Sequence, residues 1–377
     1  MASNSAIYIL GLGNMGKFVA HSLRKYNPEQ PISLVFHKDT MFDAWRQEGS
    51  GITSIRNGVS DYQGGFDVVG CESLKHGLRN QPIRNLIVAT KSYSTVDAIR
   101  DMAHLLDKDS NILFLQNGMG APDLVSEQLF PARKTRPTYY AGICSAGVHN
   151  NTNSVFTFVQ AGLGPIRIGQ IGMTCDNEEA IRLPPLNNPL LAAFTNAGPA
   201  LLTSVLTPKD IYIQQLSKLA VNAIINPLTA IFGCRNGKLF QNKQRIQVIR
   251  NLISEEVGPV IRTLLPKDTL ELEKGQFQDD QLYEIARKTA EATGENYSSM
   301  LKDVKDGRQT EIEFILGYLQ REAWKRHRLE TPQIKSLIYH VNKLKKEYFR
   351  QDGKCLTLDD RLYCTKAWKD IDWSNEH

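Results

Sequence analysis

The chain has 377 residues, of which 41% are hydrophobic and 23% are charged, and it carries a formal net charge of +5. This length allows two domains with separate cores, and the composition is that of a soluble globular protein, without the dense basic stripe of a dedicated nucleic-acid binder. The N-terminal segment lacks a basic stretch before its short apolar run, and no run of roughly 18 apolar residues follows, so we expect neither a secretory signal nor a membrane span. These absences favour a cytoplasmic protein and leave a mitochondrial location open.

The first part of the chain alternates strand-like and helix-like runs. A helix-like run at Gly16–Lys25 follows the first apolar run, and the helix-like run VDAIRDMAHLL follows the third. The apolar runs that predict buried strands are Ile7–Leu10, Ile32–Phe36, Leu86–Thr90 and Ile112–Leu115. This alternation predicts an α/β domain with a doubly wound parallel sheet of the Rossmann type.

The middle and the end of the chain differ from this beginning. Two strand-like runs, SVFTFV and IRIG, lie between residues 137 and 206, and we expect them to extend the same sheet as antiparallel strands at its edge. Helical periodicity dominates from Ile211 to Phe349. We therefore predict an α/β domain at 1–206 and an all-α domain at 207–377.

A glycine motif stands between the first predicted strand and the first predicted helix, and it reads Gly11-Leu12-Gly13-Asn14-Met15-Gly16. In this position the first glycine allows a tight turn, the second lets the backbone approach a pyrophosphate, and the third allows close packing of helix on strand. The helix then presents its amide groups and the positive end of its dipole to the phosphates. The motif predicts a bound dinucleotide.

The end of the second predicted strand favours NADPH over NADH as that dinucleotide. NAD enzymes usually carry an acidic residue there to bind the ribose 2′-hydroxyl. Here the strand ends in His37 and Lys38, and the nearest carboxylate, Asp39, comes after the expected place. The two basic side chains suit a 2′-phosphate; the alternative is that they are solvated loop residues.

Two further polar residues follow predicted strands directly. Lys91 comes after the strand LIVAT and Asn117 after ILFLQ. Ligands of open parallel sheets bind beyond the carboxyl ends of the strands. We therefore expect both side chains to contact cofactor or substrate, although a solvated lysine and an Asn-Gly turn are the ordinary alternatives.

The stretch KLAVNAIINP carries Lys218, Asn222 and Asn226 at intervals of four, which places them on one face of an otherwise apolar helix. Reduction of a ketone needs a proton donor to the developing alkoxide and polar groups that hold the substrate. A lysine and two amides on one face could supply both. The alternative is a structural amide network around Pro227.

At this point the sequence resembles the ketopantoate reductase (2-dehydropantoate 2-reductase) family over nearly its whole length. The matching segments are GLGNMG, the lysine of ATKSY, LQNGMG, KLAVNAIINPLTAIFGCRNG and NYSSMLKDVKDGRQTEIEFILGYL. The resemblance implies a Rossmann domain followed by a helical domain, and NADPH-dependent reduction of 2-dehydropantoate to (R)-pantoate, a step in pantothenate and coenzyme A biosynthesis.

The resemblance also implies roles for single residues. Lys218 matches the general acid and Glu311 the carboxylate that assists it, although the residues alone would make Glu311 part of a solvated acidic turn. Lys91 and Asn117 match residues at the junction of cofactor and substrate, and Lys38 falls near the basic residue for the 2′-phosphate. The positions that match the family's substrate-binding residues are Asn222, Asn226, Asn236 and Ser299.

Two other functions are compatible with the sequence. One is an NADPH reductase of another branched 2-oxo acid such as ketoisovalerate, since a pocket that differs by a methylene discriminates by only ~1–3 kcal/mol. The other is a non-catalytic, RNA-associated protein on the same fold, supported only by basic runs at 321–328 and 342–350. We expect a small-molecule substrate, no nucleic acid, no membrane and no metal, since the six cysteines form no metal-ligand pattern. The resemblance also allows a homodimer.

Overall fold

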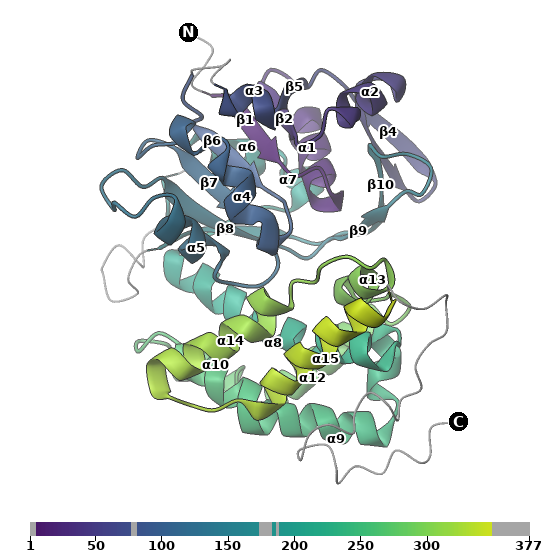
Figure 1. Cartoon of the computed structure of the whole chain (residues 1–377), viewed down its shortest axis with the longest axis vertical. Helices are drawn as coiled ribbons and strands as arrows, with labels where there is room; N and C mark the ends of the chain where they lie inside the picture. The colour runs from purple at the N-terminus through teal and green to yellow at the C-terminus, as the bar shows by residue number, and fades with distance from the viewer. Residues whose placement is uncertain (1–4, 77–80, 173–182, 186–187, 349–377) are drawn as a thin grey trace. The chain divides into compact units, whose positions relative to one another are not determined.

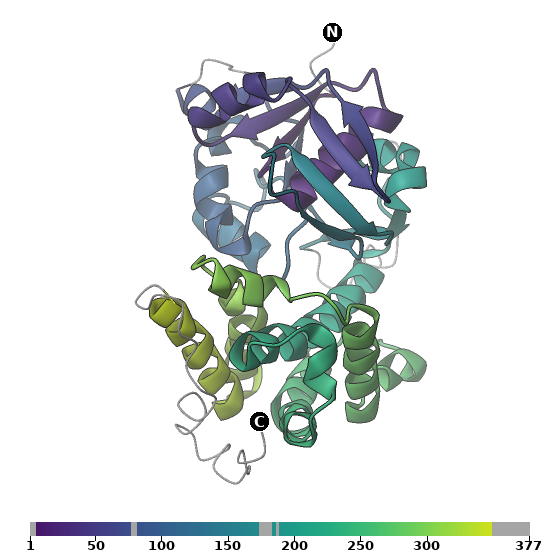
Figure 2. The same cartoon turned by 90° about the vertical axis from the view of Figure 1, so that its right-hand side faces the viewer.

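The computed structural model describes residues 5–76, 81–172, 183–185 and 188–348 (Figures 1 and 2). Three of the six cysteines, Cys175, Cys355 and Cys364, and the end of the second basic run lie outside these residues.

The chain divides into two compact units. Unit 1 comprises Met1–Gln116 and Ala121–Gln214, and unit 2 comprises Asn117–Gly120 and Gln215–His377. A short loop after one strand of unit 1 is therefore part of unit 2. The domain limits predicted from the sequence, 1–206 and 207–377, stay a prediction.

The main sheet of unit 1 is mostly parallel. Its strands follow the order β12-β11-β8-β7-β6-β1-β2-β5, and only the pair β11/β8 is antiparallel. The bounds in the described chain are β1 (Ile7–Leu10), β2 (Ile32–Phe36), β5 (Asp67–Gly70), β6 (Asn85–Val88), β7 (Asn111–Phe114), β8 (Thr138–Cys144), β11 (Ile166–Ile171) and β12 (Ser204–Leu206). The predicted α/β fold is confirmed, and the run IRIG forms an antiparallel strand of this sheet as expected.

The run SVFTFV was assigned to the wrong sheet. Its last three residues belong to β10 (Thr157–Gly162), in a separate sheet of order β4-β3-β10-β9. The other strands of that sheet are β3 (Ile52–Arg56), β4 (Val59–Gln63) and β9 (Gly147–Asn150). The physical reason is that fully buried Phe158 packs edge-on against Phe18 of helix α1 (Asn14–Tyr26), so the apolar side of β10 faces that helix. The strands of this second sheet lie beside α1 in Figure 2.

Side chains alternate between the two faces of the main sheet. Ile9, Leu34 and Ile87 belong to the core cluster under α1, whereas their neighbours Leu10 and Val88 belong to the cluster on the other face. This period of two is what a sheet covered on both faces requires. The helices of the first cluster are α1, α2 (Thr40–Gln47), α6 (Pro189–Asn196) and α7 (Gly198–Leu201); those of the second are α3 (Cys71–Lys75), α4 (Thr95–Arg100) and α5 (Ala121–Gln128).

The predicted helix VDAIRDMAHLL is shorter than expected. Helix α4 ends at Arg100, and a 3₁₀ turn at Ala103–Leu105 completes the segment. The carbonyl of Leu105 accepts a hydrogen bond from the amide of Ile83, ahead of β6, at 2.8 Å. The helix therefore ends early, because the residues after it bond to Ile83, just before β6.

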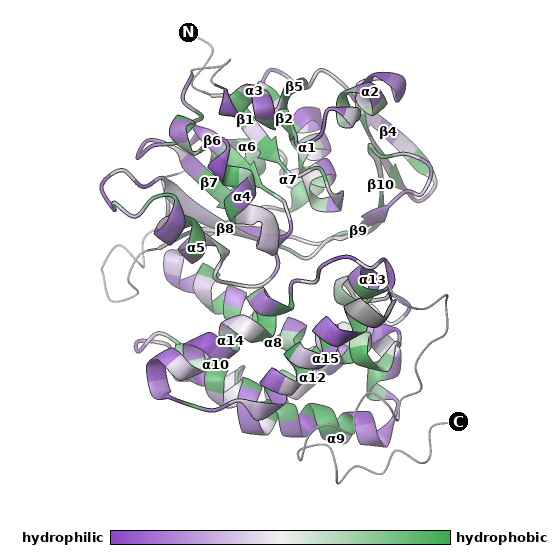
Figure 3. Cartoon of the chain, viewed as in Figure 1, coloured by the Kyte–Doolittle hydropathy of each residue, from purple (hydrophilic) through white to green (hydrophobic). Residues whose placement is uncertain are grey.

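The described part of unit 2 is helical, and hydrophilic and hydrophobic residues alternate along its helices (Figure 3). Its helices are α8 (Pro208–Phe232, which begins in unit 1), α9 (Lys243–Leu252), α10 (Gly258–Leu264), α11 (Glu271–Gly275), α12 (Asp279–Ala292), α13 (Ser299–Lys305), α14 (Ile312–His327) and α15 (Pro332–Tyr348), with a π-helical turn at Ile253–Val257. Among the described residues we find no helix with the length and apolar character needed to cross a membrane.

Helix α8 connects the two units covalently. Its Ile211 packs on Ala141 and Ile143 of β8, and the helix then continues through Pro227 to Phe232. Proline lacks the amide that would bond to the carbonyl of Ala223, so α8 lacks one of its backbone hydrogen bonds at this turn.

Candidate active site

The turn between β1 and α1 requires two of its glycines for internal packing. Gly11 has φ +99°, and a Cβ there would lie 2.6 Å from the amide nitrogen of Thr90. A Cβ on Gly16 would lie 1.9 Å from the carbonyl oxygen of Gly11. Both distances are too short for any side chain, so these glycines allow α1 to begin directly against the end of β6.

The middle glycine is different. Gly13 has φ −67°, and no atom lies within 4 Å of the position of its missing Cβ. Nothing in the described chain requires a glycine here. No side chain caps α1 and no acid occurs in its first turn, so the amide groups of that turn point to a space that suits an anion. The buried Oδ1 of Asn14, the next residue, has no hydrogen-bond partner.

Lys17, directly after the motif, has a structural role that the sequence did not reveal. It is 3% exposed, and its Nζ donates hydrogen bonds to the carbonyls of Val155 (2.9 Å) and Thr157 (3.0 Å). Burial lowers the pKa of Lys17 from 10.5 to about 8, and nearby Glu48 partly opposes this. The lysine therefore fastens α1 to the second sheet.

Because Lys17 is buried, we expect the free energy of unfolding to vary with pH in the alkaline range. Between pH 8 and 10.5 the unfolded chain holds the Lys17 proton more tightly than the folded chain, so the free energy of unfolding gains a contribution that rises with pH. The neutral amine keeps the two hydrogens needed by Val155 and Thr157. We expect the stability advantage of the wild type over Lys17→Met, measured by urea unfolding, to grow between about pH 7.5 and 9.5. A constant or shrinking advantage would contradict this.

The strand end next to the motif carries the predicted phosphate-binding residue. Exposed His37 and Lys38 follow β2, and β2 lies beside β1 in the sheet. Partial burial and the charge of Lys38 lower the pKa of His37. Asp39 precedes α2 and its side chain makes no capping bond there. The role of Lys38 stays a prediction.

Lys91 lies at the same edge of the sheet, half-buried after β6, which is paired in parallel with β1. Gln116, which the sequence did not single out, follows β7 at this edge. Its Nε2 donates to the carbonyl (2.9 Å) and hydroxyl (3.0 Å) of Thr90, and its buried Oε1 has no hydrogen-bond partner. The sequence could have singled out Gln116, because it directly precedes Asn117 after a predicted strand.

Asn117 belongs to unit 2, where it contacts the predicted catalytic carboxylate. Its Nδ2 lies 3.5 Å from Oε2 of Glu311, which is 5% exposed and precedes α14. Two residues on, the amide of Met119 donates to the carbonyl of Phe314 at 2.8 Å. Gly118 has φ +79°, and a Cβ there would lie 2.3 Å from that same carbonyl. The loop therefore lies backbone to backbone against the first turn of α14.

Lys218, Asn222 and Asn226 all lie within α8, so their spacing of four residues places them on one face of the helix, as predicted. Lys218 and Asn222 are half-buried and Asn226 is 7% exposed, on a helix whose other residues are mostly apolar and buried. Buried polar groups of this kind are costly unless a partner meets them. The helix therefore carries a polar face that needs partners from the protein or from a ligand.

Three predicted substrate residues lie on segments that are joined by the chain or by hydrogen bonds: Asn226 on α8, Asn236 in the turn after α8, and Ser299 at the start of α13. Asn236 begins a 3₁₀ turn after α8; its amide donates to the carbonyl of Asn296 (3.0 Å) and its Nδ2 to Oγ1 of Thr293 (2.9 Å). Its buried Oδ1 has no hydrogen-bond partner. Exposed Ser299 begins α13, three residues beyond Asn296. The glycine motif, Lys38 and Lys91 belong to unit 1.

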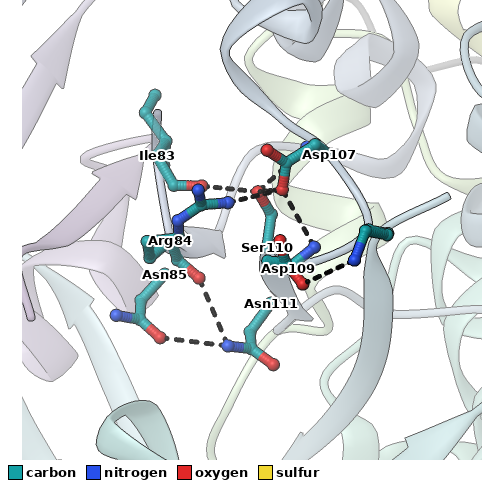
Figure 4. A network of polar contacts seen from close by, with 8 residues as sticks. Ile83, Arg84, Asn85, Asp107, Asp109, Ser110 and Asn111 are labelled. Atoms are coloured by element: carbon teal, nitrogen blue, oxygen red, sulfur yellow. Dashed lines mark hydrogen bonds and ion pairs between the residues drawn. The ribbon is translucent and has the colours of Figure 1, made fainter. Parts of the chain in front are cut away.

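A polar network at the opposite edge of the main sheet has a structural explanation (Figure 4). Some of its residues line an open hollow of about 320 Å³ at the amino ends of β6 and β7. Asn111 Nδ2 donates to Oδ1 of Asn85 (3.3 Å), and the Ser110 hydroxyl donates to the carbonyl of Ile83 (2.7 Å). These groups bond to one another, so we assign no ligand to them. No group of three or more His, Cys, Asp or Glu side chains among the described residues could hold a metal ion.

Comparison with known proteins gives the family. A sequence-family model described as ketopantoate reductase PanE/ApbA matches residues 7–172, and the family model of the C-terminal part of ketopantoate reductase matches residues 210–345. A 2-dehydropantoate 2-reductase of Saccharomyces cerevisiae is 28% identical over 343 residues, which cover 85% of this chain and 88% of the relative. A ketoisovalerate reductase of Gibberella fujikuroi is 26% identical over 362 residues, covering 84% and 78%.

A solved structure and a bacterial relative complete the comparison. A structure of D-mandelate dehydrogenase with NADH and anilino(oxo)acetate has a TM-score of 0.71 at 20% identity, covering 91% of this chain and 99% of that one, and supports the fold. The 2-dehydropantoate 2-reductase of Salmonella typhimurium is 31% identical over 270 residues, covering 70% of this chain and 75% of the relative. Together with the two family models, this similarity shows that the chain belongs to the ketopantoate reductase family.

Proposed function

We propose that this protein catalyses the NADPH-dependent reduction of 2-dehydropantoate to (R)-pantoate. The observation that carries the proposal is the polar face of α8, with half-buried Lys218 and Asn222 and buried Asn226 on an otherwise apolar helix. Family membership and relatives named 2-dehydropantoate 2-reductase support the choice of substrate. We also propose that the enzyme is cytoplasmic and acts without nucleic acid or metal. A homodimer is compatible with this function.

The first turn of α1 fits the pyrophosphate of a dinucleotide. Gly13 leaves open space beside uncapped amide groups, and no acidic side chain competes for them. Lys38 would bind the 2′-phosphate, and Lys91 and Asn117 the nicotinamide end. When bound there, NADPH supplies the hydride that reduces the 2-oxo group.

The helical unit supplies the remaining chemistry. Lys218 donates a proton to the carbonyl oxygen as negative charge develops on it, and its own positive charge stabilises that oxygen. Glu311 assists, with Asn117 hydrogen-bonded to its carboxylate. The substrate's carboxylate and hydroxyl are held by Asn222, Asn226, Asn236 and Ser299.

The test is a comparison of kcat/KM on two 2-oxo acids and two cofactors. We expect ketopantoate with NADPH to be the best pair, exceeding ketoisovalerate by about 10⁴-fold, because ketoisovalerate lacks the hydroxyl group and a site that hydrogen-bonds a substrate hydroxyl rejects an analogue without it by about 10⁴–10⁵-fold. Consumption of NADPH, followed by absorbance, gives the rates. A preference for ketoisovalerate would transfer the proposal to that substrate, as the Gibberella relative's name would suggest, and a preference for NADH would reject the role given to Lys38.

A further inference from the structure

Two buried hydroxyls join helix α8 to the start of helix α13. Oγ1 of Thr229 and Oγ of Ser298 lie 2.7 Å apart and share a hydrogen bond, although 69 residues separate them in the sequence. Thr229 is fully buried and Ser298 is 5% exposed. A hydrogen bond shielded from water in this way is costly to break, because neither hydroxyl can turn to solvent instead.

Each hydroxyl is also bound to its own helix. Oγ1 of Thr229 lies 2.6 Å from the carbonyl oxygen of Ile225 and 3.1 Å from that of Asn226. Oγ of Ser298 accepts the amide of Leu301 at 3.1 Å and so caps α13. The shared bond therefore connects a turn of α8 with the N-cap of α13.

Both ends of this connection lie beside residues proposed to hold the substrate. Asn226 is three residues before Thr229 and has its carbonyl against the Thr229 hydroxyl, and Ser299 directly follows Ser298. Pro227 lies in the same turn of α8, where it removes one backbone hydrogen bond. The side-chain bond thus attaches α13 to α8 within one turn of the residue that lacks a backbone hydrogen bond.

We propose that Thr229 and Ser298 are positioning residues that keep Asn226 and Ser299 at a fixed separation, so that both can bind the same substrate molecule. They hold the two segments together without touching the substrate. This inference rests on the proposed function, because it takes Asn226 and Ser299 as substrate-binding residues.

The test compares Thr229→Val, which removes the hydroxyl at nearly constant volume, with Thr229→Ser, which keeps it. We expect KM for the 2-oxo acid to rise about tenfold in Thr229→Val, equivalent to ~1.4 kcal/mol of lost binding. Loss of binding shared by ground and transition states leaves kcat within about threefold and KM for NADPH unchanged. Thr229→Ser should restore KM. Thr269→Val is the control, because it removes another buried hydroxyl, one that bonds to the carbonyl of Pro266 at 2.6 Å.

A double-mutant cycle and hydrogen exchange complete the test. If the two hydroxyls act as a pair, Thr229→Val combined with Ser298→Ala raises KM no further than the worse single variant, whereas multiplied effects would overturn the proposal. Faster amide exchange at Leu301 in Thr229→Val, but not in Thr269→Val, is expected without any substrate. Unchanged exchange there, or unchanged KM, would also overturn it. A wild type that reduces neither 2-oxo acid would count against the proposed function alone.

Discussion

Replacing Lys218 by alanine is expected to lower kcat by about 10²–10⁴-fold, the usual contribution of a positioned general acid. The alanine variant has no group to protonate the developing alkoxide and no charge to stabilise it. The predicted dinucleotide contacts lie mainly in unit 1, so the affinity for NADPH should change little. Steady-state rates with saturating ketopantoate give kcat, and a fluorescence titration gives the Kd of NADPH.

Two further variants separate charge from proton transfer. Arginine at this position keeps a positive charge but holds its proton above pH 12, so Lys218→Arg should retain part of the affinity for the 2-oxo acid while kcat stays low. Lys335, exposed on α15, is the matched control, and Lys335→Ala should behave as the wild type. Unaltered turnover in Lys218→Ala would reject the general-acid role.

The sequence predicted those features whose cause is local. Apolar residues are continuous along Ile7–Leu10 and Leu86–Val88 because both faces of the sheet are covered, and such a run is readable without a structure. The glycine motif is partly local, since the positive φ of Gly11 and the close approach of Gly16 to the carbonyl of Gly11 arise within one turn, whereas the contact of Gly11 with Thr90 involves a distant segment. The four-residue spacing of polar side chains on α8 follows from helix geometry alone.

The features that were missed depend on contacts between distant segments. The separate sheet forms because Thr157 pairs with Thr53 in a parallel register, and neither short run shows its partner in the sequence. Asn117 was placed correctly at the end of a strand, but its contact with Glu311 spans 194 residues. A lysine such as Lys17, buried against carbonyls, also contradicts the usual expectation that lysines are exposed.

The second large effect is expected for Gly13→Ser, because at this position folding and ligand binding should respond in opposite directions. Gly13 has an extended backbone conformation that serine adopts readily, and serine is a better N-cap than glycine by a few tenths of a kcal/mol. The variant should therefore be as stable as the wild type or slightly more so. Its side chain would, however, fill the space beside the first turn of α1 and bond to the same amides that a phosphate needs. We expect the Kd of NADPH to rise about 100-fold, equivalent to roughly 2.7 kcal/mol.

Two other glycines make this result interpretable. A Cβ on Gly198, the first residue of α7, also meets no atom within 4 Å, so Gly198→Ser tests a similarly open position away from the motif and should bind NADPH normally. A Cβ on Gly16 would meet the carbonyl of Gly11 at 1.9 Å, so Gly16→Ser should lower the melting temperature itself. Thermal unfolding followed with and without NADPH distinguishes the cases, since a bound ligand raises the melting temperature only while it binds. Normal NADPH binding by a stable Gly13→Ser variant would show that the open space beside this glycine is not a phosphate site.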